Sequence, residues 1–135
     1  MEAAGALLLL PVFLPEYGGK GIWMAVFHSI SAFCNAGFDI LGTADDPFPS
    51  LIGYSGNVLV NVVIMLLIIV GGIGFLTWDD IYTNKLNFQR YRMQSKIILI
   101  TSAGLILFPT IFFFVCDLND LSAGKRLLAA LFQSV

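Results

Sequence analysis

Residues 21–34 read GIWMAVFHSISAFC, and this stretch decides how the rest of the chain can be arranged. It is apolar and helical in pattern, yet its 14 residues would form a helix only roughly 21 Å long. The hydrocarbon core of a bilayer is about 30 Å thick, so the segment is too short to cross it. Polar chain flanks it on both sides, EYGGK at 16–20 and the stretch from Asp39 onward.

The composition of the whole chain is that of a protein built to sit in lipid. Of its 135 residues, 58% are hydrophobic and 12% are charged, and the mean hydropathy is +0.87. The net charge is −2 and no run of basic residues covers a face, so we expect no nucleic acid partner. The first partner that we expect is the lipid bilayer of the cell membrane.

Two other segments, Val58–Trp78 and Ile97–Val115, are long and apolar enough to cross a bilayer. The apolar part of the N-terminus, Ala3–Pro15, would reach only about 20 Å as a helix. It therefore either lies in the interface or is the outer end of a spanning helix. Glu2 stands where a signal peptide would have basic residues, which argues against cleavage.

The loops assign the two sides of the membrane. Residues 79–96 hold four of the seven basic residues, which places this loop in the cytoplasm. They are Lys85, Arg90, Arg92 and Lys96. Residues 39–52 hold Asp39, Asp45 and Asp46 without any Lys or Arg, so this loop belongs outside. Residues 21–34 must then enter and leave on the outer face, as a re-entrant half-helix followed by extended chain.

The residues after the half-helix, Cys34-Asn35-Ala36-Gly37-Phe38, suit the selection of cations better than catalysis. A short helix that descends from outside aims the negative end of its dipole at the membrane centre. Extended chain beyond it can offer backbone carbonyls to a dehydrated cation. Gly37 suits such a path because glycine adopts positive φ without strain and brings no Cβ. A helix C-cap before a turn explains Gly37 alone equally well.

An internal repeat supports this organisation. Residues 19–30, GKGIWMAVFHSI, align without gaps on residues 124–135, GKRLLAALFQSV, at an offset of 105 residues. The identical pairs are Gly19/Gly124, Lys20/Lys125, Ala25/Ala130, Phe27/Phe132 and Ser29/Ser134. Each copy follows an apolar segment and an acidic stretch, with Glu16 before the first and Asp117 and Asp120 before the second. We expect a repeat unit of spanning helix, re-entrant half-helix, filter and spanning helix, and the second copy stops before its filter.

Four stretches of the chain carry a resemblance to one known family. They are FHSISAFCNAGFDILG at 27–42, VGGIGFLTWDD at 70–80, QSKIILITSAGLIL at 94–107 and ALFQSV at 130–135. In this order they resemble the second pore loop, the helix after it, the first helix of the next repeat and the opening of the third pore loop. The family is the membrane (pore) subunit of Ktr/Trk-type potassium uptake systems (KtrB/TrkH-like), and the resemblance covers nearly the whole chain.

The resemblance implies four pore-loop repeats in one subunit, with a glycine of each loop lining one central path for K⁺. The matching residue here is Gly37, and the backbone carbonyls of Cys34, Asn35, Ala36 and Gly37 are the implied ligands of K⁺, the only metal ion that we expect. The family also implies a membrane homodimer, a cytoplasmic nucleotide-binding regulatory subunit and, in Ktr-type systems, Na⁺ as a coupling ion. No covalently bound cofactor is expected. Asp39, near the pore mouth, would raise the local cation concentration.

The sequence therefore predicts an all-α integral membrane protein with spanning helices, a re-entrant pore half-helix and a filter loop. The expected segments are the end of a spanning helix at 1–17, the re-entrant pore helix and filter at 18–38, an extracellular loop at 39–52, a spanning helix at 53–78, the cytoplasmic basic loop at 79–96, a spanning helix at 97–116, and an extracellular loop with the start of the next pore helix at 117–135.

The expected function is potassium transport across the membrane by a truncated chain, a fragment of a four-repeat subunit. The other pore-loop repeats are then its missing partners, and alone it should form no pore. The alternative is a non-conducting, small multi-pass membrane assembly protein.

We expect no catalytic residue and no enzyme. His28 and Ser29 are adjacent in a helix and so point about 100° apart, and no GxSxG motif is present. His28 is expected to bond to a neighbouring helix. Cys34 and Cys116 lack His or Cys neighbours at ligand spacing, and we expect two small buried residues rather than a metal site.

Polar and small residues of the segment 57–74 are expected to serve helix packing. Asn57 and Asn61 lie one turn apart, and we predict interhelical hydrogen bonds from them. Gly71, Gly72 and Gly74 lack the Lys-Ser/Thr that a phosphate-binding loop requires, so close packing of helices is the expected role.

Overall fold

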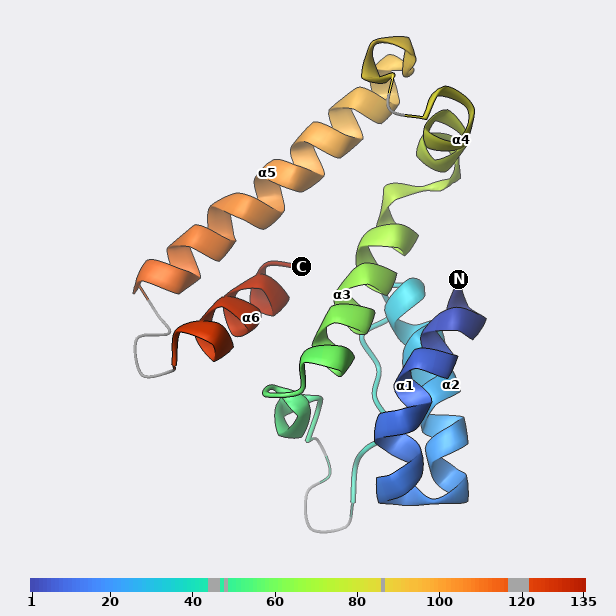
Figure 1. Ribbon diagram of the computed structural model, residues 1–135, viewed down its shortest axis with the longest axis vertical. Helices are drawn as coiled ribbons and strands as arrows, with labels where there is room; N and C mark the ends of the chain where they lie inside the picture. Colours follow the sequence, from blue (N-terminus) through green and yellow to red (C-terminus); the bar gives the residue numbers. More distant parts are fainter. Residues whose placement is uncertain (44–46, 48, 86, 117–121) are drawn as a thin grey trace. The chain divides into compact units, whose positions relative to one another are not determined.

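The computed structural model of the chain describes residues 1–43, 47, 49–85, 87–116 and 122–135. It is helical, and no strand occurs among these residues, as the sequence predicted. The elements follow in the order α1 (Glu2–Tyr17), α2 (Gly19–Phe33), η1 (Ile52–Tyr54), α3 (Val58–Ile73), α4 (Phe75–Asn84), η2 (Phe88–Arg90), α5 (Met93–Cys116) and α6 (Ala123–Ser134) (Figure 1). They form two compact units, Met1–Gly72 and Ile73–Val135. Each unit contains one tryptophan, Trp23 in α2 and Trp78 in α4.

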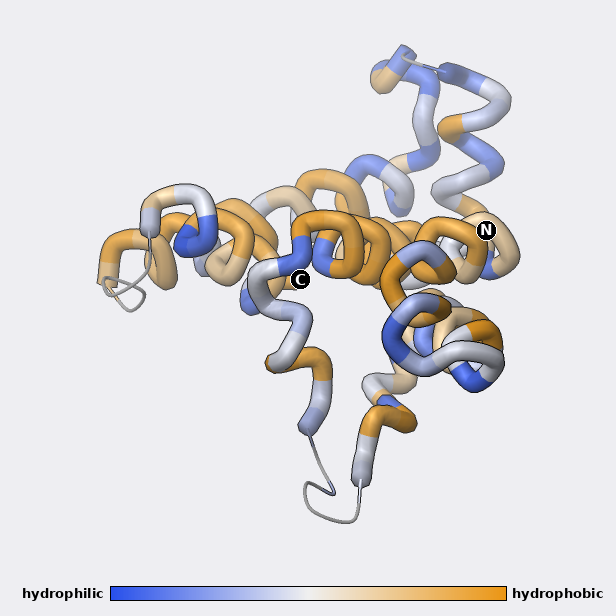
Figure 2. The backbone as a smooth tube through the Cα atoms, turned by 60° about the horizontal axis from the view of Figure 1, so that its bottom comes forward, coloured by the Kyte–Doolittle hydropathy of each residue, from blue (hydrophilic) through white to orange (hydrophobic). Residues whose placement is uncertain are grey.

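Among the described residues, α5 is the helix that is long and apolar enough by itself to cross a membrane. Its 24 residues reach about 36 Å as a helix, and Figure 2 draws it largely in the orange of hydrophobic residues. The pair α3 and α4 meets the same criterion only when the two are taken together.

The helix predicted at 53–78 is interrupted at Gly74. This residue has a φ of 84°, a left-handed value that glycine adopts without strain, and it separates α3 from α4. The segment predicted as a basic loop, 79–96, is partly helical, because α4 continues to Asn84 and α5 begins at Met93. Asp45, Asp46, Asp117 and Asp120 lie outside the described residues.

The first helix pair, α1 and α2, is an antiparallel hairpin whose helices lie side by side (Figure 1). The helices meet closely at Gly21, where a Cβ would lie only 2.2 Å from the Phe13 carbonyl oxygen. Near the other end of the hairpin, the Ser29 hydroxyl donates to the Glu2 carbonyl at 2.7 Å. A Cβ on Gly5 would lie 2.5 Å from that same hydroxyl oxygen, so the backbone of α1 rests directly on Ser29.

The second helix pair is formed by α5 and α6, and α6 folds back along α5 (Figure 1). The Thr110 hydroxyl of α5 donates to the Ser134 hydroxyl of α6 at 2.9 Å. Ser134 in turn donates to the Ala130 carbonyl at 2.6 Å. The Arg126 guanidinium lies 4.6 Å from the centre of the Phe114 ring, which is cation–π distance. Polar and cationic side chains thus join these two helices.

The start of α5 is held by the carboxylate of Asp80 from α4. Asp80 accepts hydrogen bonds from the Arg92 backbone N–H at 3.0 Å and from the Ser95 hydroxyl. The guanidinium of Arg92 also pairs with Asp79 at 3.1 Å. The Ser95 hydrogen bond, outweighing the effect of burial, holds the pKa of Asp80 below its usual range. Asp80 therefore acts as a charged cap on the first turn of α5.

Among the described residues, neither Asn57, just before α3, nor Asn61, in its first turn, forms the predicted interhelical bond, and that prediction is wrong. The Asn57 side chain accepts from the Val60 N–H at 3.2 Å, which is the geometry of an N-cap. The Asn61 amide donates to the carbonyls of Tyr54 at 2.8 Å and of Asn57 at 2.7 Å. The Asn57 side chain thus satisfies an orphan N–H of the first turn of α3. The Asn61 amide is a second donor to carbonyls that already accept backbone N–H groups, those of Asn57 and Asn61.

Candidate functional site

The end of α2 is a Schellman motif. The N–H of Asn35 donates to the Ala32 carbonyl at 3.1 Å, and the N–H of Ala36 donates to the Ser31 carbonyl at 2.9 Å. Asn35 has a φ of 52° and occupies the left-handed position of the motif. The helix cap is therefore built around Asn35, and Gly37 lies beyond it, so the interpretation of Gly37 as the C-cap is wrong.

Gly37 makes a second left-handed turn two residues later, with a φ of 71°. Apart from its two chain neighbours, no described residue has an atom within 4 Å of the place where a Cβ would be. The sequence predicted extended chain after α2. That prediction is wrong for Asn35 and Gly37, because both have positive φ. Residues 34–38 are all exposed, which corrects the predicted burial of Cys34, and the thiol of Cys116 is also exposed and free.

The carbonyls of Cys34, Asn35, Ala36 and Gly37 are the main chemical feature of this loop. Within the described residues, no hydrogen bond is donated to any of these four carbonyls, although the amides of Cys34, Asn35 and Ala36 all donate back to α2. Peptide carbonyls carry two lone pairs each and bind dehydrated cations. The loop can therefore offer a short run of consecutive oxygens.

The far side of the loop is tied back to α2 by Ser31. The hydroxyl of this buried residue donates to the Phe38 carbonyl at 2.8 Å and accepts from the Phe38 N–H at 3.0 Å. Sequence reasoning did not single out Ser31, because a serine within an apolar helix is an ordinary residue and only its distance from Phe38 marks it.

α3 packs against the end of α2 and the start of the loop at Gly71 and Gly72. A Cβ on Gly71 would lie 1.8 Å from the Phe33 carbonyl oxygen, and one on Gly72 would lie 3.3 Å from the Asn35 amide nitrogen. The predicted close packing is confirmed for Gly71, because only a residue without a Cβ allows this approach. Gly74 instead interrupts the helix.

Asp39 begins the return of the chain away from the loop. Its carboxylate accepts from the Leu41 N–H at 3.1 Å, an Asx turn, and the residue is half-buried. Asp39 lies two residues beyond Gly37 in the chain.

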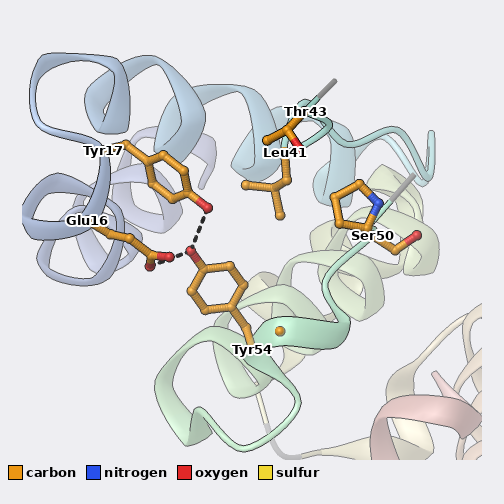
Figure 3. A pocket seen from close by; sticks show the side chains of 8 residues that line it. Glu16, Tyr17, Leu41, Thr43, Ser50 and Tyr54 are labelled. Carbon is orange, nitrogen blue, oxygen red and sulfur yellow. Dashed lines mark hydrogen bonds between the residues drawn. The ribbon is translucent and has the colours of Figure 1, made fainter. Parts of the chain in front are cut away.

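A pocket of about 320 Å³ lies near the C-terminal end of α1. Figure 3 shows Tyr54 reaching toward Glu16 and Tyr17, and its hydroxyl donates to the Glu16 carboxylate at 2.6 Å. Burial, followed by the hydrogen bond to Glu16, raises the pKa of Tyr54 above its ordinary value. The phenol therefore remains protonated and fastens the end of α1 to the η1 turn.

His28 and Ser29 are brought to separate partners. The Nδ1 of His28 donates to the Met24 carbonyl of its own helix at 2.8 Å, so the predicted bond to a neighbouring helix is wrong. The ring instead stacks on Phe13 of α1 at 5.3 Å between centroids. Ser29 bonds to Glu2, and these positions give His28 a packing role.

Comparison with known proteins places these features in context. The profile of the family TrkH, described as "Cation transport protein", matches residues 3–115. The potassium/sodium uptake protein NtpJ of Enterococcus hirae is 39% identical over 141 residues, covering 100% of this chain and 30% of that relative. The Ktr system potassium uptake protein B is 33% identical in Vibrio alginolyticus, over 98% of this chain, and 32% identical in Bacillus subtilis, over 100%. The chain spans about 30% of the length of these relatives.

Proposed function

Since the chain belongs to the TrkH family of cation transport proteins, we propose that residues 18–38 supply one filter loop of a cation path across the membrane. In this role α2 is the re-entrant pore helix. The carbonyls of Cys34, Asn35, Ala36 and Gly37 are the ligands of the ion. The observation that carries the proposal is that all four carbonyls lack hydrogen-bond donors within the described residues.

The transported ion in this proposal is K⁺, with Na⁺ as a second or coupling ion. NtpJ is named for potassium and sodium uptake, and the Ktr relatives are named for potassium uptake. A carbonyl filter can serve either ion, because discrimination depends on geometry and field strength rather than on side-chain identity. The remaining repeats, a second subunit and a cytoplasmic nucleotide-binding regulator are the partners that this function calls for.

The proposed topology places residues 39–52 outside and residues 79–96 in the cytoplasm. The basic side chains of the second segment support its cytoplasmic side. The carboxylate of Asp39 then lies on the outer side, where it attracts cations toward the loop.

The test uses a chimera in which residues 1–135 replace the aligned segment of NtpJ, expressed in cells that lack potassium uptake. Rubidium uptake is compared for Gly37→Ala and Gly18→Ala. Both glycines have positive φ and open space around the missing Cβ, so an alanine is strained at either position. Only Gly37→Ala should reduce uptake, by roughly tenfold or more.

Equal loss in both variants, or full uptake with Gly37→Ala, would contradict the filter assignment. A chimera that inserts into the membrane yet takes up no rubidium would favour the non-conducting assembly protein instead. In the same cells, Asp39→Asn should reduce uptake at low ionic strength and leave it unchanged at high ionic strength, since salt screens an outer charge. Unchanged uptake at low ionic strength would remove Asp39 from the proposal.

A further inference from the structure

Ser31 holds both chain neighbours of Gly37. Its carbonyl accepts the Ala36 N–H at 2.9 Å. Its hydroxyl donates to the Phe38 carbonyl at 2.8 Å and accepts the Phe38 N–H at 3.0 Å. From these three hydrogen bonds we infer that Ser31 is a positioning residue that sets the cation specificity of the loop, an inference that rests on the proposed function.

A serine hydroxyl is suited to this position because one oxygen both donates and accepts. Ser31 lies in the last turn of α2 and is only 7% exposed, so its oxygen is fixed by a packed helix. Alanine would leave both the N–H and the carbonyl of Phe38 without this partner. Threonine keeps the hydroxyl and can restore both bonds.

The three bonds confine the loop in a particular way. With Ala36 and Phe38 tied to one residue of α2, Gly37 is the single residue between two fixed points. Carbonyl filters distinguish cations by the distance and field of their oxygens, so a loop held at both ends presents a narrower range of geometries. When the hydroxyl is removed, the Phe38 end is released, and cations of different size should be distinguished less well.

The experiment measures KM and Vmax for K⁺ and for Na⁺ uptake by the NtpJ chimera and three variants, Ser31→Ala, Ser31→Thr and Ser29→Ala. Ser29 is the matched control, a buried serine one half-turn earlier in α2 whose hydroxyl bonds to Glu2 and not to the loop. Ser31→Ala should shift the ratio of the two KM values about tenfold, the size of a net hydrogen bond or two. Ser31→Thr should restore the ratio, and Ser29→Ala should leave it unchanged.

A purely structural role would lower Vmax for both ions equally, through fewer folded transporters, and would leave the KM ratio intact. That result for Ser31→Ala, or an equal shift with Ser29→Ala, would overturn the inference while the chimera's uptake still supports the proposed function. Absence of uptake by the unmodified chimera would overturn both. If Ser31→Ala does not accumulate in the membrane, Ser31→Cys replaces it in the experiment, because a thiol forms only weak hydrogen bonds. Ser31→Cys should then shift the ratio of the KM values for K⁺ and Na⁺, and an unchanged ratio would overturn the inference.

Discussion

The two helix pairs, α1–α2 and α5–α6, use one arrangement with different chemistry. Ser29 and Ser134 are 105 residues apart, and so are the residues that they meet on the preceding helix, Gly5 and Thr110. In the first pair a glycine lets the helix backbone rest on the serine. In the second pair a threonine hydroxyl bonds to it. A serine therefore lies at the same position of both pairs, but the contact that it makes differs. It is a close contact with the backbone at Gly5 in the first pair and a hydrogen bond to the Thr110 side chain in the second.

The two helix pairs differ in the same way at a second pair of positions, eight residues before Ser29 and Ser134. Gly21 presses α2 against the backbone of α1 at Phe13. The residue 105 positions later is Arg126, which reaches out to the Phe114 ring and, at 3.4 Å, to the Val115 carbonyl at the end of α5. The first pair is thus joined by close approach and the second by longer side chains, and each can be tested by substitution at matched positions.

The largest effect is expected for Gly21→Ala. The new Cβ would lie 2.2 Å from the Phe13 carbonyl oxygen and 2.8 Å from the Leu14 Cα, both backbone atoms, so α1 and α2 must move apart. We expect a loss of about 3 kcal/mol in the free energy of unfolding in detergent micelles. The matched control Arg126→Ala removes a cation–π contact and should cost only about 0.5–1 kcal/mol. Equal costs would show that the two pairs do not differ in closeness of contact.

A smaller effect is expected from the hydroxyl pair of α5 and α6. A double-mutant cycle of Thr110→Val and Ser134→Ala should give a coupling free energy of about 0.6 kcal/mol, the usual size of a hydrogen bond between membrane helices. The same cycle for Thr110→Val and Ser29→Ala, whose hydroxyl bonds to Glu2, should give none. A coupling of zero for the first pair would mean that the 2.9 Å contact contributes nothing to α5–α6 packing.

The smallest expected effect is a pH dependence in the second unit, where the Asp80 carboxylate stabilises the start of α5. The Ser95 hydrogen bond lowers the pKa of Asp80 below the ordinary value of 3.8. Its stabilisation is therefore present above that ordinary value and is lost as the pH falls through the lowered one. Protection of the Arg92 amide, which donates to Asp80, should stay constant from pH 7 to about pH 4 and decrease as the pH falls below 3.8, after correction for intrinsic exchange rates.

Asp80→Asn should abolish this pH dependence, whereas Asp79→Asn should retain it, because Asp79 pairs with the Arg92 guanidinium rather than with its N–H and is half exposed. The Ser29 hydroxyl that joins α1 and α2 does not titrate in this range, so that contact should not weaken with it. A pH dependence that survives in Asp80→Asn would assign it to another group.

The helices could be predicted from the sequence because apolar runs of sufficient length must satisfy their backbone internally. The break between α3 and α4 could not be located, since VGGIGF offers three glycines and only Gly74 adopts a positive φ. Gly71, by contrast, serves the close approach to Phe33. Which glycine turns the chain depends on what packs beside each one, and a local pattern does not contain that information.

The candidate loop was found from its residue types, but its internal construction was not. Asn35 and Gly37 both tolerate left-handed backbone, and the one that caps α2 depends on where the helix ends, which sequence locates only to within a few residues. The contact of Ser31 with Phe38 depends on the turn that Asn35 and Gly37 make between them, so it could not be predicted before that turn was known. Repetition at an offset of 105 residues was more informative, because its Ala25/Ala130 and Ser29/Ser134 identities lie on the packed faces of the hairpins.

The division into two compact units has a spectroscopic consequence. Because Trp23 belongs to the first unit and Trp78 to the second, each unit carries its own fluorophore. Replacing Trp78 by phenylalanine leaves an emission that reports on α2 alone, and replacing Trp23 leaves one that reports on α4. Two unfolding curves recorded from these variants separate the melting of the hairpin that carries the loop from that of the junction capped by Asp80.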